Sequence, residues 1–219
     1  MFITLEGIEG SGKTTQMAHI ARFLEGRGRT CVQTREPGGT GIGEKLRAIL
    51  LDPAHRHLAP GAELLLYTAD RVQHVQEVVA PALETGRTVL CDRFFDATLV
   101  YQGYARGLDR HLVQTLHNLL LGGLKPDLTL LLDLDPEAGL SRAWRQLDSG
   151  SRGNGESRFE KEALAFHRKV RAGYLDLAAG EPQRFAVVDA ARSEAAVRET
   201  IFEILDRRLN RLPTSGAAV

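Results

Sequence analysis

GIEGSGKTT, at residues 7–15, fills the pattern GxxxxGK[ST] between a short apolar run and a segment of helical period. Glycines at these spacings let the backbone curl so that successive N–H groups face inward, and the first turn of the following helix adds partial positive charge. In such a loop the Lys13 ammonium meets the β and γ phosphates of a nucleotide, and the Thr14 hydroxyl binds Mg²⁺. The segment therefore predicts a site for a nucleoside triphosphate and its Mg²⁺.

Positive charge is scarce in this loop. None of its variable positions 8–11 is basic, so Lys13 is the only cation that it sets against the charge of a transferring phosphoryl group. Further cations must come from other parts of the chain. The nucleotide is expected to contact the whole loop, which consists of Gly7, Ile8, Glu9, Gly10, Ser11, Gly12, Lys13, Thr14 and Thr15.

Short apolar runs alternate with longer segments of helical period along the rest of the chain. The runs expected to form strands are residues 2–6, 30–34, 88–91, 128–133 and 185–188. The segments expected to form helices are residues 14–26, 43–51, 60–85, 110–121, 136–147, 159–179 and 195–212. This alternation predicts the α/β class, a P-loop fold with a five-stranded parallel sheet flanked by helices.

The composition is typical of one globular domain. The chain has 219 residues, 43% of them hydrophobic and 26% charged, which suits a single domain with a sizeable core. We expect that domain over residues 1–212 and a flexible tail over residues 213–219. The 28 basic and 28 acidic side chains cancel, so no overall field would attract nucleic acid or an anionic membrane. Any anion site must be local.

The cysteines and the apolar runs bear on location. Cys31 and Cys91 are too few for a disulfide framework and lie in apolar runs, which is typical of reduced thiols in the cytoplasm. The first apolar run contains Glu6 and follows no basic leader, and runs such as residues 128–132 are far shorter than a membrane span. We expect a cytoplasmic protein without a targeting or transmembrane segment.

Chemically distinctive segments follow three of the predicted strands. They are residues 6–12, residues 35–41 and residues 92–95. Ligands bind beyond the carboxyl ends of parallel strands, so we expect these segments to converge on one crevice. There Asp92 could hold Mg²⁺ through water or orient an attacking oxygen. The alternatives are an ordinary turn at Pro37 and an N-cap at Asp92.

The stretch DSGSRGNGES at residues 148–157 breaks the alternation, because it is polar and rich in glycine between two predicted helices. It is either an ordinary surface loop or part of a mobile active-site lid over about residues 142–158. A closing lid could deliver the missing cation to the transferring phosphate. Of Arg142, Arg145, Arg152 and Arg158, we expect this role for Arg142 with one of Arg145 or Arg152.

Several short motifs occur in the order and spacing of one enzyme family. After GIEGSGKTT come TREPGGT at 34–40 with Glu44 and Arg47 following, YTADRVQ at 67–73, DRF at 92–94, YQG at 101–103 and RFE at 158–160. In these motifs the chain resembles the bacterial-type thymidylate kinases over nearly its whole length. The resemblance implies transfer of the ATP γ-phosphate to dTMP with Mg²⁺, giving dTDP for dTTP synthesis and DNA replication. It also implies a homodimer.

The resemblance further implies roles for individual residues. Glu9 and Asp92 would lie near the sugar 3′-hydroxyl and the metal, and Tyr101 would occupy the space that a ribose 2′-hydroxyl needs. The implied contacts of dTMP come from Arg35, Arg47 and Arg93 to its phosphate, from Tyr67, Arg71 and Gln102 to its base, and from Thr98 as a further polar group.

Some positions depart from the family pattern. Tyr67 stands where Phe is usual, and Ala97 precedes Thr98 where two hydroxyl residues are common, so one polar contact is absent. Asp70 occupies a position that is commonly small, which could shift how Arg71 is held. The lid is longer than usual, so its arginines cannot be aligned one to one.

Elementary chemistry supports the choice of base independently. An arginine can only donate hydrogen bonds, so Arg71 would satisfy O4 of thymine but would face the amino group of cytosine, donor against donor. The alternatives are a solvated charge for Arg71 and a core aromatic for Tyr67.

Weaker signals remain open. The seven histidines show no zinc-site spacing and are expected at the surface or at helix caps. Asp133 and Asp135 are either metal ligands after a strand or an N-cap before Pro136. Trp144 is expected to pack rather than to stack on adenine, and residues 189–192 lie where related kinases hold adenine through backbone groups.

Two rival functions fit the phosphate loop alone. One is another small-molecule P-loop kinase, which TREPGGT and YQG disfavour. The other is a nucleotide-dependent switch that signals to a protein partner. A switch would have no second ligand pocket.

Overall fold

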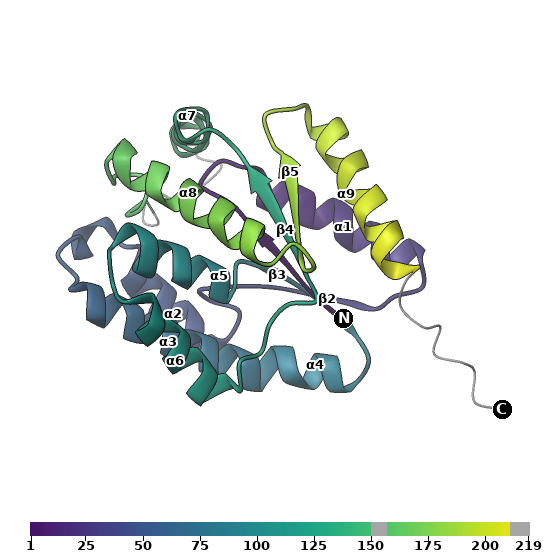
Figure 1. Ribbon diagram of the computed structural model, residues 1–219, viewed down its shortest axis with the longest axis horizontal. Helices are drawn as coiled ribbons and strands as arrows, with labels where there is room; N and C mark the ends of the chain where they lie inside the picture. Colours follow the sequence, from purple (N-terminus) through teal and green to yellow (C-terminus); the bar gives the residue numbers. More distant parts are fainter. Residues whose placement is uncertain (150–156, 211–219) are drawn as a thin grey trace.

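Five parallel strands form one sheet within the part of the chain that the computed structural model describes, residues 1–149 and 157–210. The strands lie in the order β2-β3-β1-β4-β5 (Figure 1). Their bounds are β1 Phe2–Glu6, β2 Cys31–Arg35, β3 Thr88–Asp92, β4 Leu128–Asp133 and β5 Phe185–Asp189. All five predicted strands and the α/β class are confirmed, with the ends of three strands shifted by one residue.

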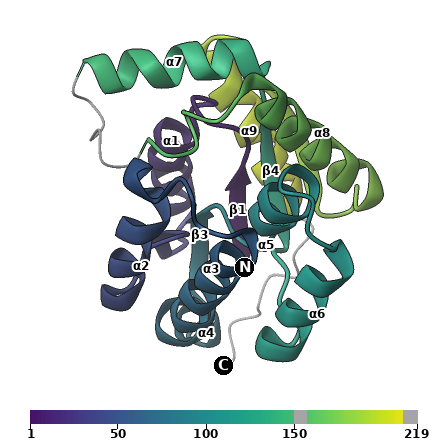
Figure 2. The same cartoon turned by 90° about the vertical axis from the view of Figure 1, so that its left-hand side faces the viewer.

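Helices cover both faces of this sheet. α1 (Lys13–Gly26) and α9 (Glu194–Leu209) lie together on one face, and α8 (Leu164–Gly180) lies on the other (Figure 1). α7 (Pro136–Asp148) crosses the end of the sheet toward which β1 points (Figure 2). The other helical segments are α2 Gly41–Leu51, η1 Pro53–His55, α3 Pro60–His74, η2 Val75–Val79, α4 Ala80–Glu84, α5 Phe95–Thr98, η3 Leu99–Ala105 and α6 Arg110–Leu121. The carboxyl ends of the strands thus lie under α7.

The helix predicted over residues 60–85 is helical throughout, but one π turn interrupts it. The π turn is η2, and α4 follows it with Pro81 at its start. Pro81 has no N–H to give to the carbonyl one turn earlier, so the chain widens there before it resumes the α form. The interruption therefore follows from one residue.

Two predicted helix boundaries are wrong. The helix predicted from residue 159 begins at Leu164, because Arg158 and Phe159 are buried against the site and the backbone N–H of Arg158 donates to Leu51 O at 3.2 Å. The helix predicted to residue 212 ends at Leu209, and the tail prediction falls on residues outside the described ranges. Sequence periodicity also missed α5 and η3, which are too short to show a helical period.

The core lies on both faces of the strands. Ile3 and Leu5 of β1 pack into one apolar cluster, while Phe2 faces a second cluster that includes Val79 and Phe94. Side chains alternate between the faces of a strand, so a central strand with both faces covered is predominantly apolar, and its polar residues Thr4 and Glu6 are buried as well. This burial fixes the end of β1 and hence the loop that follows it.

The residues that the structure describes contain no helix long and apolar enough to cross a membrane.

Candidate active site

The phosphate loop leaves β1 and enters α1 through two glycines in left-handed conformations. Gly10 has φ 72° and Gly12, the N-cap of α1, has φ 91°. A Cβ on Gly10 would collide with the backbone of Gly139 in α7. Only glycine tolerates both the torsion and this close approach. The predicted loop therefore forms between strand and helix as expected, with α7 packed directly on it.

Lys13 is held inside the loop. Its Nζ donates to Gly7 O at 3.0 Å and to Ile8 O at 2.9 Å, and the side chain is 9% exposed. Burial, followed by repulsion from Arg93, lowers the pKa of Lys13 to about 8, although Asp92 opposes the shift. The ammonium is thus held in place by two carbonyls of the loop, and it loses its proton more readily than the ammonium of a surface lysine.

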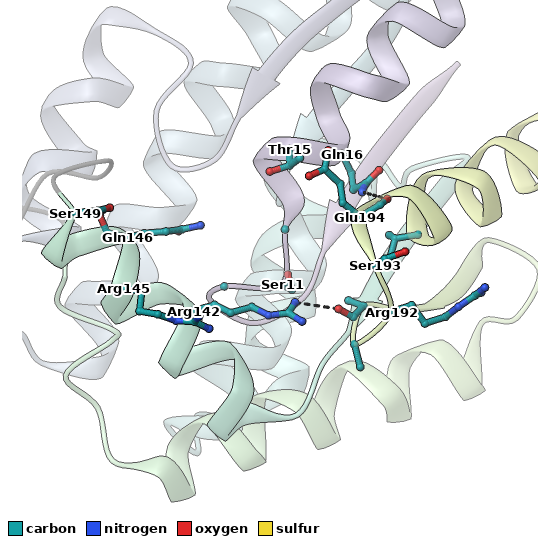
Figure 3. A pocket seen from close by; sticks show the side chains of 15 residues that line it. Ser11, Thr15, Gln16, Arg142, Arg145, Gln146, Ser149, Arg192, Ser193 and Glu194 are labelled. Carbon is teal, nitrogen blue, oxygen red and sulfur yellow. Dashed lines mark hydrogen bonds between the residues drawn. The ribbon is translucent and has the colours of Figure 1, made fainter.

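One cavity, of about 730 Å³, opens on the outer side of this loop. Figure 3 shows its wall, where Arg142 reaches from α7 and donates to Ala190 O at 3.0 Å. Gln16 donates to Glu194 O at 3.1 Å on the other side. Residues 190–194 form one wall, so the segment predicted to hold adenine does border a cavity beside the phosphate loop.

The lid arginines have different surroundings. Arg142 and Arg145 line the first cavity, and Arg145 Nε donates within its own helix to Ser141 O at 3.3 Å. Arg158, which was not among the arginines expected to reach the transferring phosphate, is 4% exposed and pairs with Glu63. Arg152 and the centre of the predicted lid fall on residues 150–156, outside the described ranges.

A second cavity, of about 620 Å³, lies on the inner side of the loop. All three segments after the strand ends border it, which confirms the predicted convergence. Both cavities touch Gly10, Gly12 and Thr15, so the phosphate loop forms the partition between them. The predicted residues that line the second cavity are Glu9, Lys13, Thr14, Arg35, Arg47, Tyr67, Arg71, Asp92, Arg93, Thr98, Tyr101 and Gln102.

Glu9 is at the centre of a buried polar cluster. Its Oε1 accepts from Arg93 Nη2 at 2.8 Å and from the Tyr101 hydroxyl at 2.6 Å, and His167 Nδ1 lies 3.3 Å from Oε2. Burial alone would raise the pKa of Glu9, but Arg93, His167 and Lys13 hold it well below its usual range. Tyr101 is thus a hydrogen-bonding partner in this cluster.

Arg93 adopts a strained backbone to reach this cluster. Its φ of 67° is positive, which is uncommon for a residue with a side chain, and its N–H donates to Leu5 O at 3.0 Å. The strain occurs one residue beyond β3, and it directs the guanidinium to Glu9. Backbone strain of this kind concentrates at functional sites.

Asp92 and Thr14 provide oxygens on the same cavity. Asp92 Oδ1 is buried without a hydrogen-bond partner among the described residues. The Thr14 side chain is exposed to the cavity at the start of α1. A carboxylate oxygen and a hydroxyl are ligands that suit Mg²⁺, so this donor set fits the ion.

Arg71 is buried rather than solvated, at 3% exposure. Its Nε donates to Glu36 Oε2 at 2.8 Å, and its Nη2 donates to Thr98 Oγ1 at 2.6 Å and to Phe94 O at 3.4 Å. Tyr67 borders the second cavity, half-buried. Thr98 therefore acts on Arg71, and the interpretation of Arg71 as a surface charge is wrong.

Two of the arginines expected at the acceptor phosphate are held near the mouth of the second cavity. Arg35 Nη2 donates to Glu44 Oε1 at 2.8 Å, with both side chains about half exposed. Arg47 Nη1 donates to Pro37 O at 2.8 Å. Both are therefore positioned by the TREPGGT segment and the helix after it.

Asp70 holds the TREPGGT segment and not Arg71. Its Oδ1 accepts from the Gly38 N–H at 3.0 Å. Burial, followed by the nearby Glu36 carboxylate, raises the pKa of Asp70 to about 7. Asp70 thus acts on the loop that carries Gly38.

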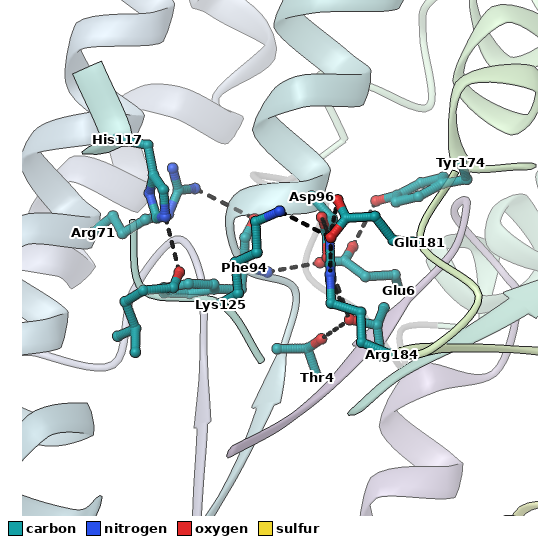
Figure 4. A network of polar contacts seen from close by, with 12 residues as sticks. Thr4, Glu6, Arg71, Phe94, Asp96, His117, Lys125, Tyr174, Glu181 and Arg184 are labelled. Atoms are coloured by element: carbon teal, nitrogen blue, oxygen red, sulfur yellow. Dashed lines mark hydrogen bonds and ion pairs between the residues drawn. The ribbon is translucent and has the colours of Figure 1, made fainter. Parts of the chain in front are cut away.

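Sequence patterns missed two carboxylates. Glu63 is fully buried and accepts from Gln102 Nε2 at 2.7 Å. Glu6 accepts from Tyr174 and from the Phe94 N–H (Figure 4). Burial, followed by the Asp96 charge, raises the pKa of Glu6 to about 8. A glutamate inside a predominantly apolar run was the available signal for Glu6, whereas Glu63 carries no such signal.

The expectation that the histidines lie at the surface is wrong for three of them. His74, His117 and His167 are buried. His74 lies between Glu36 Oε1 at 2.8 Å and Thr34 Oγ1 at 2.6 Å, so it stiffens the carboxylate that holds Arg71. The His117 ring instead stacks on Phe95, with ring centroids 3.7 Å apart, so burial of these histidines has no single cause that the sequence reveals.

The remaining weak signals are resolved simply. Asp135 caps α7, accepting from the Glu137 N–H at 2.9 Å, which confirms the N-cap interpretation. Asp133 pairs with Arg171 at 2.7 Å. Trp144 is 39% exposed and lines neither of the two cavities.

Comparisons with known proteins agree with one another. A family model described as Thymidylate kinase matches residues 5–201. A Syntrophotalea carbinolica protein named thymidylate kinase is 59% identical over 209 residues, covering 95% of this chain and 96% of the relative. A thymidylate kinase of Desulfosudis oleivorans is 57% identical over 207 residues, covering 94% and 97%. The crystal structure of thymidylate kinase from Ehrlichia chaffeensis is similar with a TM-score of 0.75 at 33% identity, covering 94% of this chain and 98% of that one.

Proposed function

Since this chain belongs to the thymidylate kinase family and phosphorylates dTMP to dTDP, we propose that ATP occupies the first cavity and dTMP the second. The observation that carries this assignment is the phosphate loop itself, which separates the two cavities and borders both. The donor and acceptor phosphates then lie on opposite sides of the phosphate loop, next to the Lys13 ammonium. In-line transfer needs this opposed arrangement.

The donor half binds mainly through backbone and cations. The N–H groups of residues 10–15 and the first turn of α1 hold the phosphates, with Lys13 at the β and γ positions. Residues 190–192 border the adenine, and Arg142 with Arg145 brings positive charge from α7 to the transferring group. Arg152, within the lid proposed over about residues 142–158, is a further candidate for this cation.

Mg²⁺ is assigned to Asp92 and Thr14, whose oxygens fit it. When bound, the ion supplies neutralisation of charge on the phosphate oxygens. The unpartnered buried oxygen of Asp92 supports this assignment.

The acceptor half binds through side chains. Arg35, Arg47 and Arg93 hold the dTMP phosphate, and Tyr67 stacks on the base. Arg71 donates to O4, and Gln102 contacts the neighbouring edge of the ring. The acceptor phosphate oxygen is already anionic and needs no strong base, so the chemistry consists of positioning and charge neutralisation.

Two further assignments follow from the family. We assign the enzyme to the cytoplasm, which agrees with the free thiols of Cys31 and Cys91. We also assign a homodimer, and the exposed Leu65 on α3 supplies apolar surface for it at 60% exposure.

Turnover of ATP against a panel of nucleoside monophosphates tests the proposal. We expect dTMP to be the best acceptor, with ADP release dependent on the acceptor and on Mg²⁺. ADP release without an acceptor would instead support a switch. A different preferred acceptor would contradict the assignment of the second cavity to dTMP.

A further inference from the structure

The orientation of the Gln102 amide is fixed by a residue outside the base contacts. Gln102 is 1% exposed and borders the second cavity, where its Nε2 donates to Glu63 Oε1 at 2.7 Å. Among residues 1–149 and 157–210, Glu63 is the one hydrogen-bond partner of the Gln102 side chain. The amide nitrogen and oxygen of Gln102 are bonded to the same carbon and point in different directions. With Nε2 turned to Glu63, Oε1 is the atom left to accept a hydrogen bond from a ligand in the cavity.

Glu63 cannot serve as a donor in this arrangement. Its Oε1 also accepts from Arg106 Nε at 3.4 Å, and its Oε2 pairs with the Arg158 guanidinium. A carboxylate between two arginines has only acceptors to offer. The amide of Gln102 must therefore turn its NH₂ toward Glu63 and its oxygen away from it.

The amide oxygen of Gln102 that does not face Glu63 matches thymine and not cytosine. Thymine carries a hydrogen on N3 next to O4, whereas cytosine carries a lone pair on N3 next to an amino group. A fixed acceptor at N3 pairs with thymine and opposes the lone pair of cytosine. Arg71, a pure donor, applies the same test at the adjacent atom, so the two residues read a donor and an acceptor side by side.

We propose that Glu63 is a specificity-determining positioning residue, which orients the Gln102 amide so that Oε1 accepts from N3–H of the acceptor base. This inference rests on the proposed function, because it takes the base to lie beside Tyr67, Arg71 and Gln102. Glu63 itself does not touch the nucleotide. Its effect is on which monophosphate is chosen.

Glu63→Gln tests the proposal, because it changes one atom and reverses the hydrogen bonding. The amide oxygen of the new side chain stays with Arg158, so its NH₂ faces Gln102 and obliges that amide to flip. A donor then meets N3. We expect the ratio of kcat/KM for dTMP over dCMP to fall about tenfold or more, the size of one reversed hydrogen bond.

The ratio of kcat/KM for dTMP over dUMP is the second readout, and it shows whether a loss of selectivity is confined to the comparison with cytosine. Uracil and thymine share N3–H and O4, so this ratio should stay within about twofold of wild type. Arg106→Gln is the matched control, since it also weakens the surroundings of Glu63 but leaves the bond to Gln102 in place. It should leave both ratios unchanged.

A second pair of variants guards against misfolding. If Glu63→Gln does not fold because Arg158 lacks its counter-charge, the double variant Glu63→Met with Arg158→Met removes both charges and also the acceptor that orients Gln102. It should narrow the dTMP over dCMP ratio relative to Arg158→Met alone. In a Gln102→Leu background, Glu63→Gln should change the ratio no further.

Each outcome bears on one claim. Wild-type enzyme that does not prefer dTMP would contradict the proposed function itself. Wild-type preference with an unchanged ratio in Glu63→Gln would overturn the role of Glu63 alone. Equal losses for dTMP, dUMP and dCMP, or a full effect of Glu63→Gln without Gln102, would also overturn it.

Discussion

The proposed donor and acceptor halves of the site differ in how their side chains are held. On the donor side, Arg142 makes one hydrogen bond to a backbone carbonyl, and Arg145 and Arg192 are exposed. On the acceptor side, Arg71 and Gln102 are almost fully buried and bonded to buried carboxylates. A triphosphate can be held by backbone N–H groups and cations, whereas choosing one base needs fixed donors and acceptors.

This difference has an energetic consequence. A buried arginine paired with a buried carboxylate costs stability when either partner is removed, because the other charge stays without compensation. An exposed arginine can be removed at little cost to the fold. Substitutions of the exposed arginines of the donor half should therefore affect rate alone, and substitutions of the buried residues of the acceptor half, such as Arg71, should affect rate, selectivity and folding together.

Lys13→Ala should produce the largest loss and tests the element that both halves share. Turnover should fall about a thousandfold, because one preorganised group at the transferring phosphate is worth two to three orders of magnitude. A circular dichroism melt should show a folded protein. Lys45→Ala, on the exposed face of α2, should retain wild-type turnover. Near-normal turnover of Lys13→Ala would remove the phosphate-loop assignment.

Arg142→Ala and Arg145→Ala test which arginine of the donor half supplies positive charge to the transferring phosphate. At saturating ATP and dTMP, kcat should fall about ten- to a hundredfold in at least one of them, with small changes in ground-state affinity. Arg22→Ala, an exposed arginine on α1 bonded to Ala18 O, is the matched control. Normal kcat in both variants would move the search for the cation to Arg152 and the acceptor arginines.

Tyr101→Phe separates the contribution of the Tyr101 hydroxyl to turnover from the steric exclusion of a ribose 2′-hydroxyl by its ring. The hydroxyl bonds to Glu9 at 2.6 Å and to Arg93 at 3.1 Å, so its loss should lower kcat about tenfold. The use of UMP relative to dUMP should not change until the ring is removed in Tyr101→Ala. Unchanged UMP use in both variants would contradict the steric assignment.

The pH dependence of ATP use should show the smallest effect. The pKa of Lys13 is lowered to about 8, so the free enzyme loses the ammonium as the pH rises through that value. The ratio kcat/KM for ATP, which reports the free enzyme, should fall about fourfold between pH 7 and pH 8.5. The kcat should stay level over this range, because bound phosphates favour the charged lysine. A level kcat/KM would contradict the pKa shift.

The donor half could be predicted from the sequence because its determinants are local. Gly10, Gly12 and Lys13 occur within one short segment, and their spacing specifies a loop between strand and helix. The strands could be predicted for a similar reason, since each is a short apolar run with both faces covered. In both cases a few neighbouring residues determine the outcome.

The acceptor half could be predicted only in its first contacts. Arg71 and Gln102 follow from the motifs, but Glu63 resembles any solvated glutamate in a helix. Its partners Gln102 and Arg158 lie 39 and 95 positions away, and no local pattern connects them. The same holds for His167, which meets Glu9 through tertiary packing. Buried networks depend on contacts that periodicity does not encode.

The most direct test of the contrast between the halves is denaturant unfolding of Arg71→Ala beside Arg142→Ala, without nucleotides. Arg71→Ala leaves Glu36 buried and uncompensated beside His74, so its free energy of unfolding should fall by about 3 kcal/mol or more. Arg142→Ala should lose at most about 1 kcal/mol. Equal losses in the two variants, or an Arg71→Ala protein as stable as wild type, would contradict the account.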